Sequence, residues 1–115
     1  MSRKQSYGGP ERRRFTRFRF RGPVGVSVVI NGATVLLSGL GSDVSENGLR
    51  AFVLGPIASG QPVELNLMLP TGKLKLKAKV QFAMGHDCGF EFTGLREDQQ
   101  MQIRKATERL EPLRT

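Results

Sequence analysis

The sequence predicts a mostly β protein: a small antiparallel β-barrel of about six strands, followed by one C-terminal α-helix. Two observations support this fold class. Short strand-like runs recur about every 8–12 residues with turn residues between them, and the composition changes to helix formers after Gly94. The 115 residues suffice for one domain with a modest core.

The first two strands are expected at Val24–Ile30 and Ala33–Ser38, on either side of Asn31-Gly32. Asn-Gly between β-branched runs is a strong hairpin signal, because a type I′ turn needs positive φ at both central residues. A third strand is expected at Leu49–Leu54, where Gly55-Pro56 ends it.

Two further strands carry apolar residues at every second position, Val63–Leu69 and Leu74–Val80, with a turn at Pro70-Thr71-Gly72 between them. Lysines alternate with the apolar residues of the second strand: Lys73, Lys75, Lys77 and Lys79. We interpret the lysines as a solvated outer face that also discourages edge-to-edge pairing. No aromatic residues are interleaved with them, as a nucleic-acid surface would require.

The last strand is expected at Gly89–Thr93, and a helix is expected over Arg96–Leu110. Ile103, Ala106 and Leu110 fall on one face of that helix, so the face can pack on the barrel. Acidic residues near its start and a basic residue near its end suit the helix dipole.

The positive charge is concentrated at the N-terminus. The formal net charge is +8, and residues 1–21 hold eight basic side chains against the single acid Glu11. Residues 22–115 hold ten basic and nine acidic side chains, so the body of the domain is nearly neutral. A concentrated cationic segment indicates an anionic partner, and phosphate is the obvious candidate.

The sequence also favours a cytoplasmic location. Cys88 is the single cysteine, so no intramolecular disulfide can form, which suits a reducing compartment. No apolar run approaches the roughly 18 residues needed to cross a membrane. The N-terminal residues lack the apolar core of a secretory signal.

Two motifs carry the chemistry. The first is Arg13-x-x-x-Arg17, within a basic run just before the first strand, and the second is Asp43-x-Ser45-x-x-Gly48, between the second and third strands. Either string alone is common in tails and loops. Their order, spacing and strand context together resemble the PilZ domain family, with its R-x-x-x-R and D/N-x-S-x-x-G elements.

The resemblance implies a six-stranded barrel of the split-barrel type over residues 11–111, between a flexible lead, residues 1–10, and a short tail, residues 112–115. It implies a ligand, cyclic di-GMP, bound on the outside of the barrel. From its residues, the chain is expected to have no enzymatic activity, cofactor or metal. The resemblance also implies a relay of the signal to a partner protein in motility, pili, exopolysaccharide production or virulence.

The motif residues fit that ligand chemically. Arginine offers a planar fork of donors that matches phosphate oxygens or the O6/N7 edge of guanine. Asp43 can accept hydrogen bonds from the guanine N1–H and N2–H₂ groups, and Ser45 can donate one. Gly48 leaves room for close approach of a backbone or for a sharp turn. The expected ligand residues, with two flanking arginines of the same run, are Arg12, Arg13, Arg14, Arg17, Asp43, Ser45 and Gly48.

Phe82 is a further expected ligand residue, because family members often place an aromatic or apolar residue against guanine on the strand before the final turn. A core aromatic explains Phe82 equally well. His86, Asp87 and Cys88 are interpreted as an exposed turn, since their spacing does not suit zinc. A catalytic triad using Ser45 and His86 is rejected, because no nucleophile elbow is present.

Two alternative functions stay open. A small basic β-barrel that binds nucleic acid would explain the N-terminal charge, although the lack of tryptophan and of an aromatic stripe makes it the weaker hypothesis. A PilZ-like protein-interaction module without a ligand is the other alternative, against which the intact motifs argue.

Overall fold

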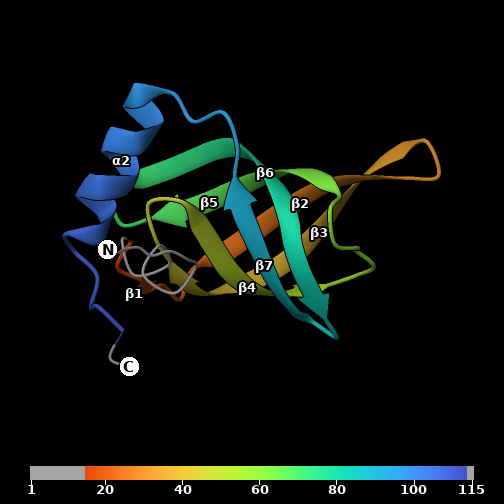
Figure 1. Cartoon of the computed structure of the whole chain (residues 1–115), viewed down its shortest axis with the longest axis horizontal. Coiled ribbons are helices and arrows are strands. Elements are labelled where there is room, and N and C mark those ends of the chain that lie inside the picture. The colour runs from red at the N-terminus through yellow and green to blue at the C-terminus, as the bar shows by residue number, and fades with distance from the viewer. Residues whose placement is uncertain (1–14, 114–115) are drawn as a thin grey trace, which may run out of the picture.

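The computed structural model describes residues 15–113. Within that range the strands form one antiparallel sheet in the order β1-β3-β2-β5-β6-β7-β4, and pairing of β3 with β4 closes it into a barrel (Figure 1). The elements are β1 Phe18–Arg19, β2 Pro23–Ile30, β3 Ala33–Val44, β4 Gly48–Leu54, β5 Pro62–Leu69, β6 Gly72–Met84, β7 Asp87–Phe92 and α2 Glu97–Thr107. The predicted fold class is confirmed, with the two-residue strand β1 added to the six expected strands.

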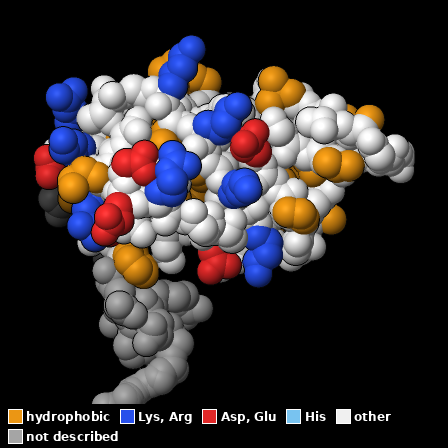
Figure 2. Space-filling model, turned by 90° about the horizontal axis from the view of Figure 1, so that it is seen from above, with side chains coloured by type: hydrophobic (Ala, Val, Ile, Leu, Met, Phe, Trp, Pro, Cys, Tyr) orange, Lys and Arg blue, Asp and Glu red, His pale blue; other side chains and the backbone are white. Residues whose placement is uncertain are grey.

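The core follows from the period-two alternation of the strands. Every second residue of β2, β5 and β6 points inward, and the register sets Val26 of β2 opposite Leu65 of β5, which in turn lies opposite Leu76 of β6. All three are at most 2% exposed. Burial of such side chains stabilises the fold by roughly 1.5–3 kcal/mol each. The intervening residues point to solvent, and the face in Figure 2 shows basic and acidic side chains interspersed.

The β2–β3 hairpin forms at the predicted turn. Asn31 and Gly32 have φ values of 52° and 82°, as a type I′ turn requires, and the register pairs Ile30 with Ala33. The hairpin projects beyond the rest of the barrel (Figure 1).

The longer strands are the main departure from the predicted bounds. β3 runs on from Ser38 to Val44, so Asp43 lies in a strand end rather than in a loop. Gly39 and Gly41 look like loop residues in the sequence, but a Cβ at Gly41 would come within 2.4 Å of the Phe20 ring. Glycine therefore lets β3 continue past a buried aromatic side chain.

The exposed turn predicted at His86, Asp87 and Cys88 is only partly correct. His86 is exposed, whereas Asp87 begins β7 and Cys88 is 1% exposed in the core. Burial, with the nearby Asp87 carboxylate, raises the pKa of the Cys88 thiol. Alternation in β7 turns Cys88 inward, so the three side chains do not converge. Among residues 15–113 no group of His, Cys, Asp or Glu could hold a metal ion.

Helix α2 covers one end of the barrel (Figure 1) and buries Ile103 and Ala106 there. Its Gln99 amide donates to the Lys75 carbonyl of β6 at 3.0 Å. The helix stops at Thr107, before the predicted Leu110, because i→i−3 hydrogen bonds tighten the last turn. In the part of the chain described here, no helix is long and apolar enough to cross a membrane.

Strand β1 is held on both sides. Its register with β3 sets Phe18 opposite Val44 and Arg19 opposite Asp43. On the other side, the Arg19 amide donates to the Glu111 carbonyl at 2.8 Å, and the Leu113 amide donates to the Arg17 carbonyl at 2.8 Å. The segment that enters the barrel is thus fixed between β3 and residues 111–113.

Candidate ligand site

The two sequence motifs meet where β1 lies beside the end of β3. Arg17 Nε donates to Asp43 Oδ1 in an ion pair, and the Ser42 hydroxyl donates to the other carboxylate oxygen at 3.1 Å. The Asp43 side chain is 5% exposed, while that of Arg17 is 40% exposed. A buried carboxylate needs such partners, because an unpaired one would be costly. The ion pair therefore joins the arginine motif to the D-x-S-x-x-G motif.

Ser45 builds the turn between β3 and β4. Its hydroxyl donates to Asn47 Oδ1 at 2.6 Å and accepts from the Asn47 amide at 3.3 Å, while the Ser45 amide donates to the Gly48 carbonyl at 2.9 Å. The residue is fully buried. These contacts are those of a local side-chain cap. A contact from Ser45 to a ligand stays a prediction.

Position 48 must be glycine for a structural reason that the sequence did not reveal. Gly48 begins β4 opposite Glu91 of β7, and a Cβ at this position would come within 2.6 Å of the Phe90 carbonyl oxygen. Real side chains do not tolerate that distance to a backbone atom. The missing side chain is therefore required by close strand packing, independently of any ligand.

Phe82 lies on the outside of the barrel, and its interpretation as a core aromatic is wrong. A bulge between Val80 and Phe82 shifts the register of β6, and Phe82 pairs with Gly89 of β7. A Cβ at Gly89 would come within 2.2 Å of the Phe82 ring, so the ring lies directly over that glycine. The side chain is half-buried. It leaves an aromatic surface next to the motif residues.

Arg50 is a site residue that the sequence interpretation missed. It lies opposite Gly89 on the other side of β7, and its guanidinium carbon is 5.9 Å from the centroid of the Phe82 ring. Arg50 and Phe82 therefore approach each other over Gly89, within the range of a cation–π contact. Strand alternation, with Arg50 two residues after Gly48, was the available signal.

Asp87 orients the Arg50 side chain. Arg50 Nε and Nη2 donate to the two Asp87 carboxylate oxygens at 2.9 and 2.6 Å. These hydrogen bonds lower the pKa of Asp87 and raise the pKa of Arg50. The Arg50 side chain is 49% exposed and that of Asp87 is 27% exposed, so solvent screens the pair and its main effect is to fix the geometry of Arg50.

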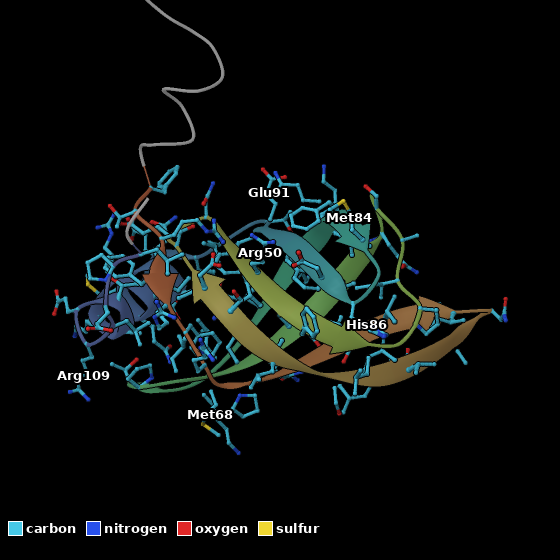
Figure 3. The ribbon with its side chains drawn as sticks, turned by 90° about the horizontal axis from the view of Figure 1, so that it is seen from below. Arg50, Met68, Met84, His86, Glu91 and Arg109 are labelled. Atoms are coloured by element: carbon cyan, nitrogen blue, oxygen red, sulfur yellow. The ribbon has the colours of Figure 1, made fainter. Side chains whose placement is uncertain are left out.

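A hollow of about 280 Å³ lies between these side chains. We call it the Arg17–Phe82 hollow, and its lining residues are Phe15, Arg17, Asn47, Gly48, Leu49, Arg50, Gln81, Phe82, Gly89, Phe90 and Glu91. Figure 3 shows Arg50 and Glu91 on the same side of the barrel, opposite Met68. Among the predicted site residues, Arg17, Gly48 and Phe82 line the hollow, whereas Asp43 lies behind Arg17 and Ser45 lies inside its turn. Arg12, Arg13 and Arg14 lie outside the described residues.

Several solved structures share the fold of this chain, including the following three. The inhibitor of motility MotI/DgrA from Bacillus subtilis matches with a TM-score of 0.68 at 16% identity, over 85% of this chain and 50% of that chain. The PilZ domain of CeSA from a cellulose-synthesizing bacterium gives a TM-score of 0.64 at 20% identity, over 80% of this chain and 94% of that one. The PilZ domain of YcgR from Escherichia coli, solved with c-di-GMP, gives 0.69 at 16% identity, over 86% of this chain and 91% of that one.

The chain thus spans half of the length of MotI/DgrA and most of the two isolated PilZ domains. A search of curated protein sequences finds no match. The profile of the PilZ domain matches residues 11–109, which is nearly the whole sequence and contains both motifs. The protein belongs to the PilZ domain family.

Proposed function

We propose that this protein is a receptor for cyclic di-GMP, that the ligand binds at the Arg17–Phe82 hollow, and that binding is relayed to a partner protein. The observation that carries the proposal is the Arg17–Asp43 ion pair, because it brings the two family motifs together beside an open hollow. Two further observations support it: YcgR, which shares the fold, was solved with this ligand, and MotI/DgrA is named as an inhibitor of motility.

The hollow offers contacts for each part of the ligand. Cyclic di-GMP has two phosphodiester charges and two guanine bases. Arg17 uses Nε for Asp43, and within residues 15–113 its two terminal nitrogens make no other hydrogen bond, so they can serve a phosphate oxygen or a guanine edge. Phe82 supplies a surface on which a base can stack, with the Arg50 guanidinium beside it.

Two carboxylates, those of Glu91 and Asp43, are candidates for contacts with the guanine bases. Glu91 lines the hollow and can accept hydrogen bonds from the N1–H and N2–H₂ groups of guanine. Asp43 can do the same only if Arg17 moves, since its carboxylate is buried behind that side chain. We therefore assign Asp43 first to positioning Arg17. Arg12, Arg13 and Arg14 come just before the lining residue Phe15 in the chain, and we expect them to add further phosphate contacts.

The proposed role is that of a cytoplasmic effector without catalytic activity. A ligand that contacts Arg17 would act on a residue with two hydrogen-bonded neighbours. The Arg17 carbonyl accepts from the Leu113 amide, and the Arg17 side chain donates to Asp43. A bound dinucleotide would therefore change the surface around β1 and the end of β3. That changed surface is what a partner protein would recognise.

Calorimetric titration of the full chain with cyclic di-GMP tests the proposal, with GMP and a short single-stranded DNA as controls. We expect selective, saturable binding of the cyclic dinucleotide. Arg17→Ala should remove a charge-assisted contact worth about 1.5–3 kcal/mol, which weakens affinity roughly 10- to 150-fold. Lys77→Ala, an exposed cation elsewhere on the barrel, should leave it unchanged.

Two results would contradict the assignment. Unchanged affinity for cyclic di-GMP in both Arg17→Ala and Arg13→Ala would show that the arginine motif is not part of the ligand site. Binding of DNA that falls steeply with salt, without heat from cyclic di-GMP, would favour the nucleic-acid alternative.

A further inference from the structure

A second surface, on the outside of β3 and β4, carries three neighbouring apolar side chains that are exposed to solvent. Leu40 and Phe52 lie opposite each other across the two strands, and Leu54 lies opposite Ser38. The three apolar side chains are 53%, 59% and 64% exposed. We call Leu40, Phe52 and Leu54 the β3–β4 apolar face. Cross-strand neighbours of this kind form a continuous patch rather than isolated surface residues.

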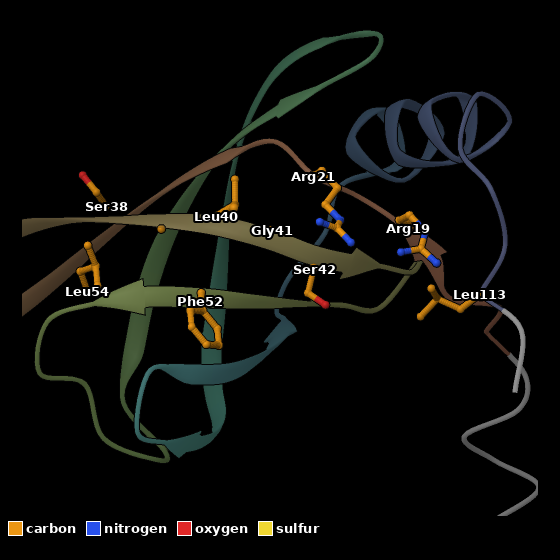
Figure 4. Close-up of a pocket in the computed structure, with 10 residues that line it drawn as sticks. Arg19, Arg21, Ser38, Leu40, Gly41, Ser42, Phe52, Leu54 and Leu113 are labelled. Atoms are coloured by element: carbon orange, nitrogen blue, oxygen red, sulfur yellow. The ribbon is translucent and has the colours of Figure 1, made fainter.

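The β3–β4 apolar face is the floor of a hollow of about 610 Å³. Figure 4 shows Arg19, Arg21 and Leu113 at one end of this hollow and Leu54 at the other. It is larger than the Arg17–Phe82 hollow, and neither Arg17 nor Phe82 lines it. It is therefore a distinct surface.

The rim of this second hollow is positively charged. Arg19 and Arg21 are both exposed, and within residues 15–113 neither side chain forms an ion pair. No acidic residue lines the hollow. Several other cations of the described chain do have acidic partners, as Arg50 has Asp87 and Arg104 has Glu46. An occupant with carboxylates would complement the two free guanidinium groups.

The charge also argues against other occupants. A second copy related by two-fold symmetry would bring the same arginines toward each other, and the whole chain carries a net charge of +8. Residues 1–14 of this chain hold five basic side chains and one acidic, so they too are repelled. Nucleic acid would need stacking surfaces, and two of the three residues of the floor are leucines.

We propose that the β3–β4 apolar face is a docking surface for an acidic, apolar segment of a partner protein. Large apolar side chains of that segment pack on Leu40, Phe52 and Leu54, and its carboxylates pair with Arg19 and Arg21. Both β3 and β4 already have strand neighbours on each side, so the segment packs on the sheet face and adds no strand. This inference rests on the proposed function only for the relay to a partner, because docking itself needs no nucleotide.

Selection from a displayed library of random linear peptides on the full chain tests the docking surface. We expect the selected peptides to be enriched in Asp or Glu together with Leu, Ile or Phe. Affinity of one selected peptide, measured by fluorescence anisotropy, should fall about tenfold or more in Phe52→Ser and in Arg21→Glu. Leu54→Ser provides a second variant of the floor.

Matched controls separate the surface from general effects of substitution. Val29 is 59% exposed, as Phe52 is, and Val29→Ser should leave peptide affinity unchanged. Lys77→Glu is the matched charge reversal for Arg21→Glu. All of these variants should keep the wild-type response to cyclic di-GMP, whereas Arg17→Ala should lose the dinucleotide and keep the peptide.

The outcomes distinguish the two proposals. The protein could bind the peptide through Phe52 and Arg21 and yet show no binding of cyclic di-GMP. That result would overturn the proposed function and support the docking surface. No enrichment of acidic, apolar peptides, or equal peptide affinity in Phe52→Ser, Leu54→Ser and Arg21→Glu, would overturn the docking surface. Self-association abolished by the same variants would overturn the choice of occupant in favour of a second copy.

Discussion

The outer faces of β6 and β4 show how differently one barrel can use its two sides. Along β6 the outward residues are Lys73, Lys75, Lys77 and Lys79, and two of these approach glutamates at 3.9 Å. Along β4 the outward residues are Arg50, Phe52 and Leu54. The inward residues of both strands are uniformly apolar and buried. The two strands therefore differ only in the half of the residues that the core does not constrain.

That contrast indicates where function is encoded. The core fixes every second residue of a strand, because a barrel must fill its interior. The outer positions are free to be charged, and solubility favours charge there. Where β4 instead exposes a phenylalanine and a leucine, and where β7 has Gly89 in place of a side chain, some other requirement acts on the sequence. The proposed ligand and the proposed partner would account for those requirements.

The largest expected effect comes from filling the space at Gly48. Gly48→Val should destabilise the fold by about 1–3 kcal/mol, because the added Cβ meets the Phe90 carbonyl oxygen. Urea unfolding measures this, and Lys77→Val on the lysine face is the matched control. A stability equal to that of the wild type would show that β4 and β7 can separate there at no cost.

An effect of similar size, on ligand binding instead of stability, should follow from removing the aromatic surface of the hollow. Phe82→Ala should weaken cyclic di-GMP binding by about 1–3 kcal/mol, the range for base stacking on an aromatic side chain. Calorimetric titration measures this loss, and Phe82→Tyr should retain affinity. Equal affinity of the wild type and Phe82→Ala would show that the ring only packs over Gly89 and does not contact the ligand.

A weaker effect concerns pH. Hydrogen bonds from Arg50 lower the pKa of Asp87, so the pair contributes stability above the ordinary carboxyl pKa and loses it as the pH falls through the lowered pKa. Arg50→Gln should therefore have a lower melting temperature than the wild type at neutral pH. That difference should shrink as the solution is acidified. Thermal unfolding followed over the acidic range measures it, and a constant difference would contradict the role of the pair.

The smallest effect is expected on the lysine face. Lys75→Ala should change stability by no more than about 0.5 kcal/mol, since its contact with Glu64 is long and both side chains are exposed. Thermal unfolding at low and moderate salt checks this. A large loss would mean that the β6 face does more than keep the barrel in solution.

The barrel was predictable because its signals are local. Alternating apolar residues and the Asn31-Gly32 turn identify strands without knowledge of their neighbours, and both are confirmed. The extension of β3 was not predictable, because the reason for Gly41 is the ring of Phe20, which comes from a different part of the chain. Sequence patterns do not report which side chain fills the space above a glycine.

The candidate site was predictable only in part, for the same reason. The motifs identified Arg17 and Asp43, but their ion pair depends on the register of β1 with β3. Strand alternation turns Arg50 outward, but it does not separate Arg50 from an ordinary solvated residue, because the partner Asp87 and the neighbour Phe82 lie on two other strands. The exposed face of Leu40 and Phe52 likewise becomes visible only once the two strands are paired.

The pairing of β1 with residues 111–113 has a consequence for the order of folding. Nearly the whole described chain separates Arg19 from Glu111, so closing this contact costs the most chain entropy and should come late, after the barrel has formed. A contact that forms late and rests on few hydrogen bonds is also among the first to open. Amide hydrogens of Arg19 and Leu113 should then exchange with solvent faster than those of β5. Such exchange would mean that the segment carrying Arg17 opens while the barrel stays intact.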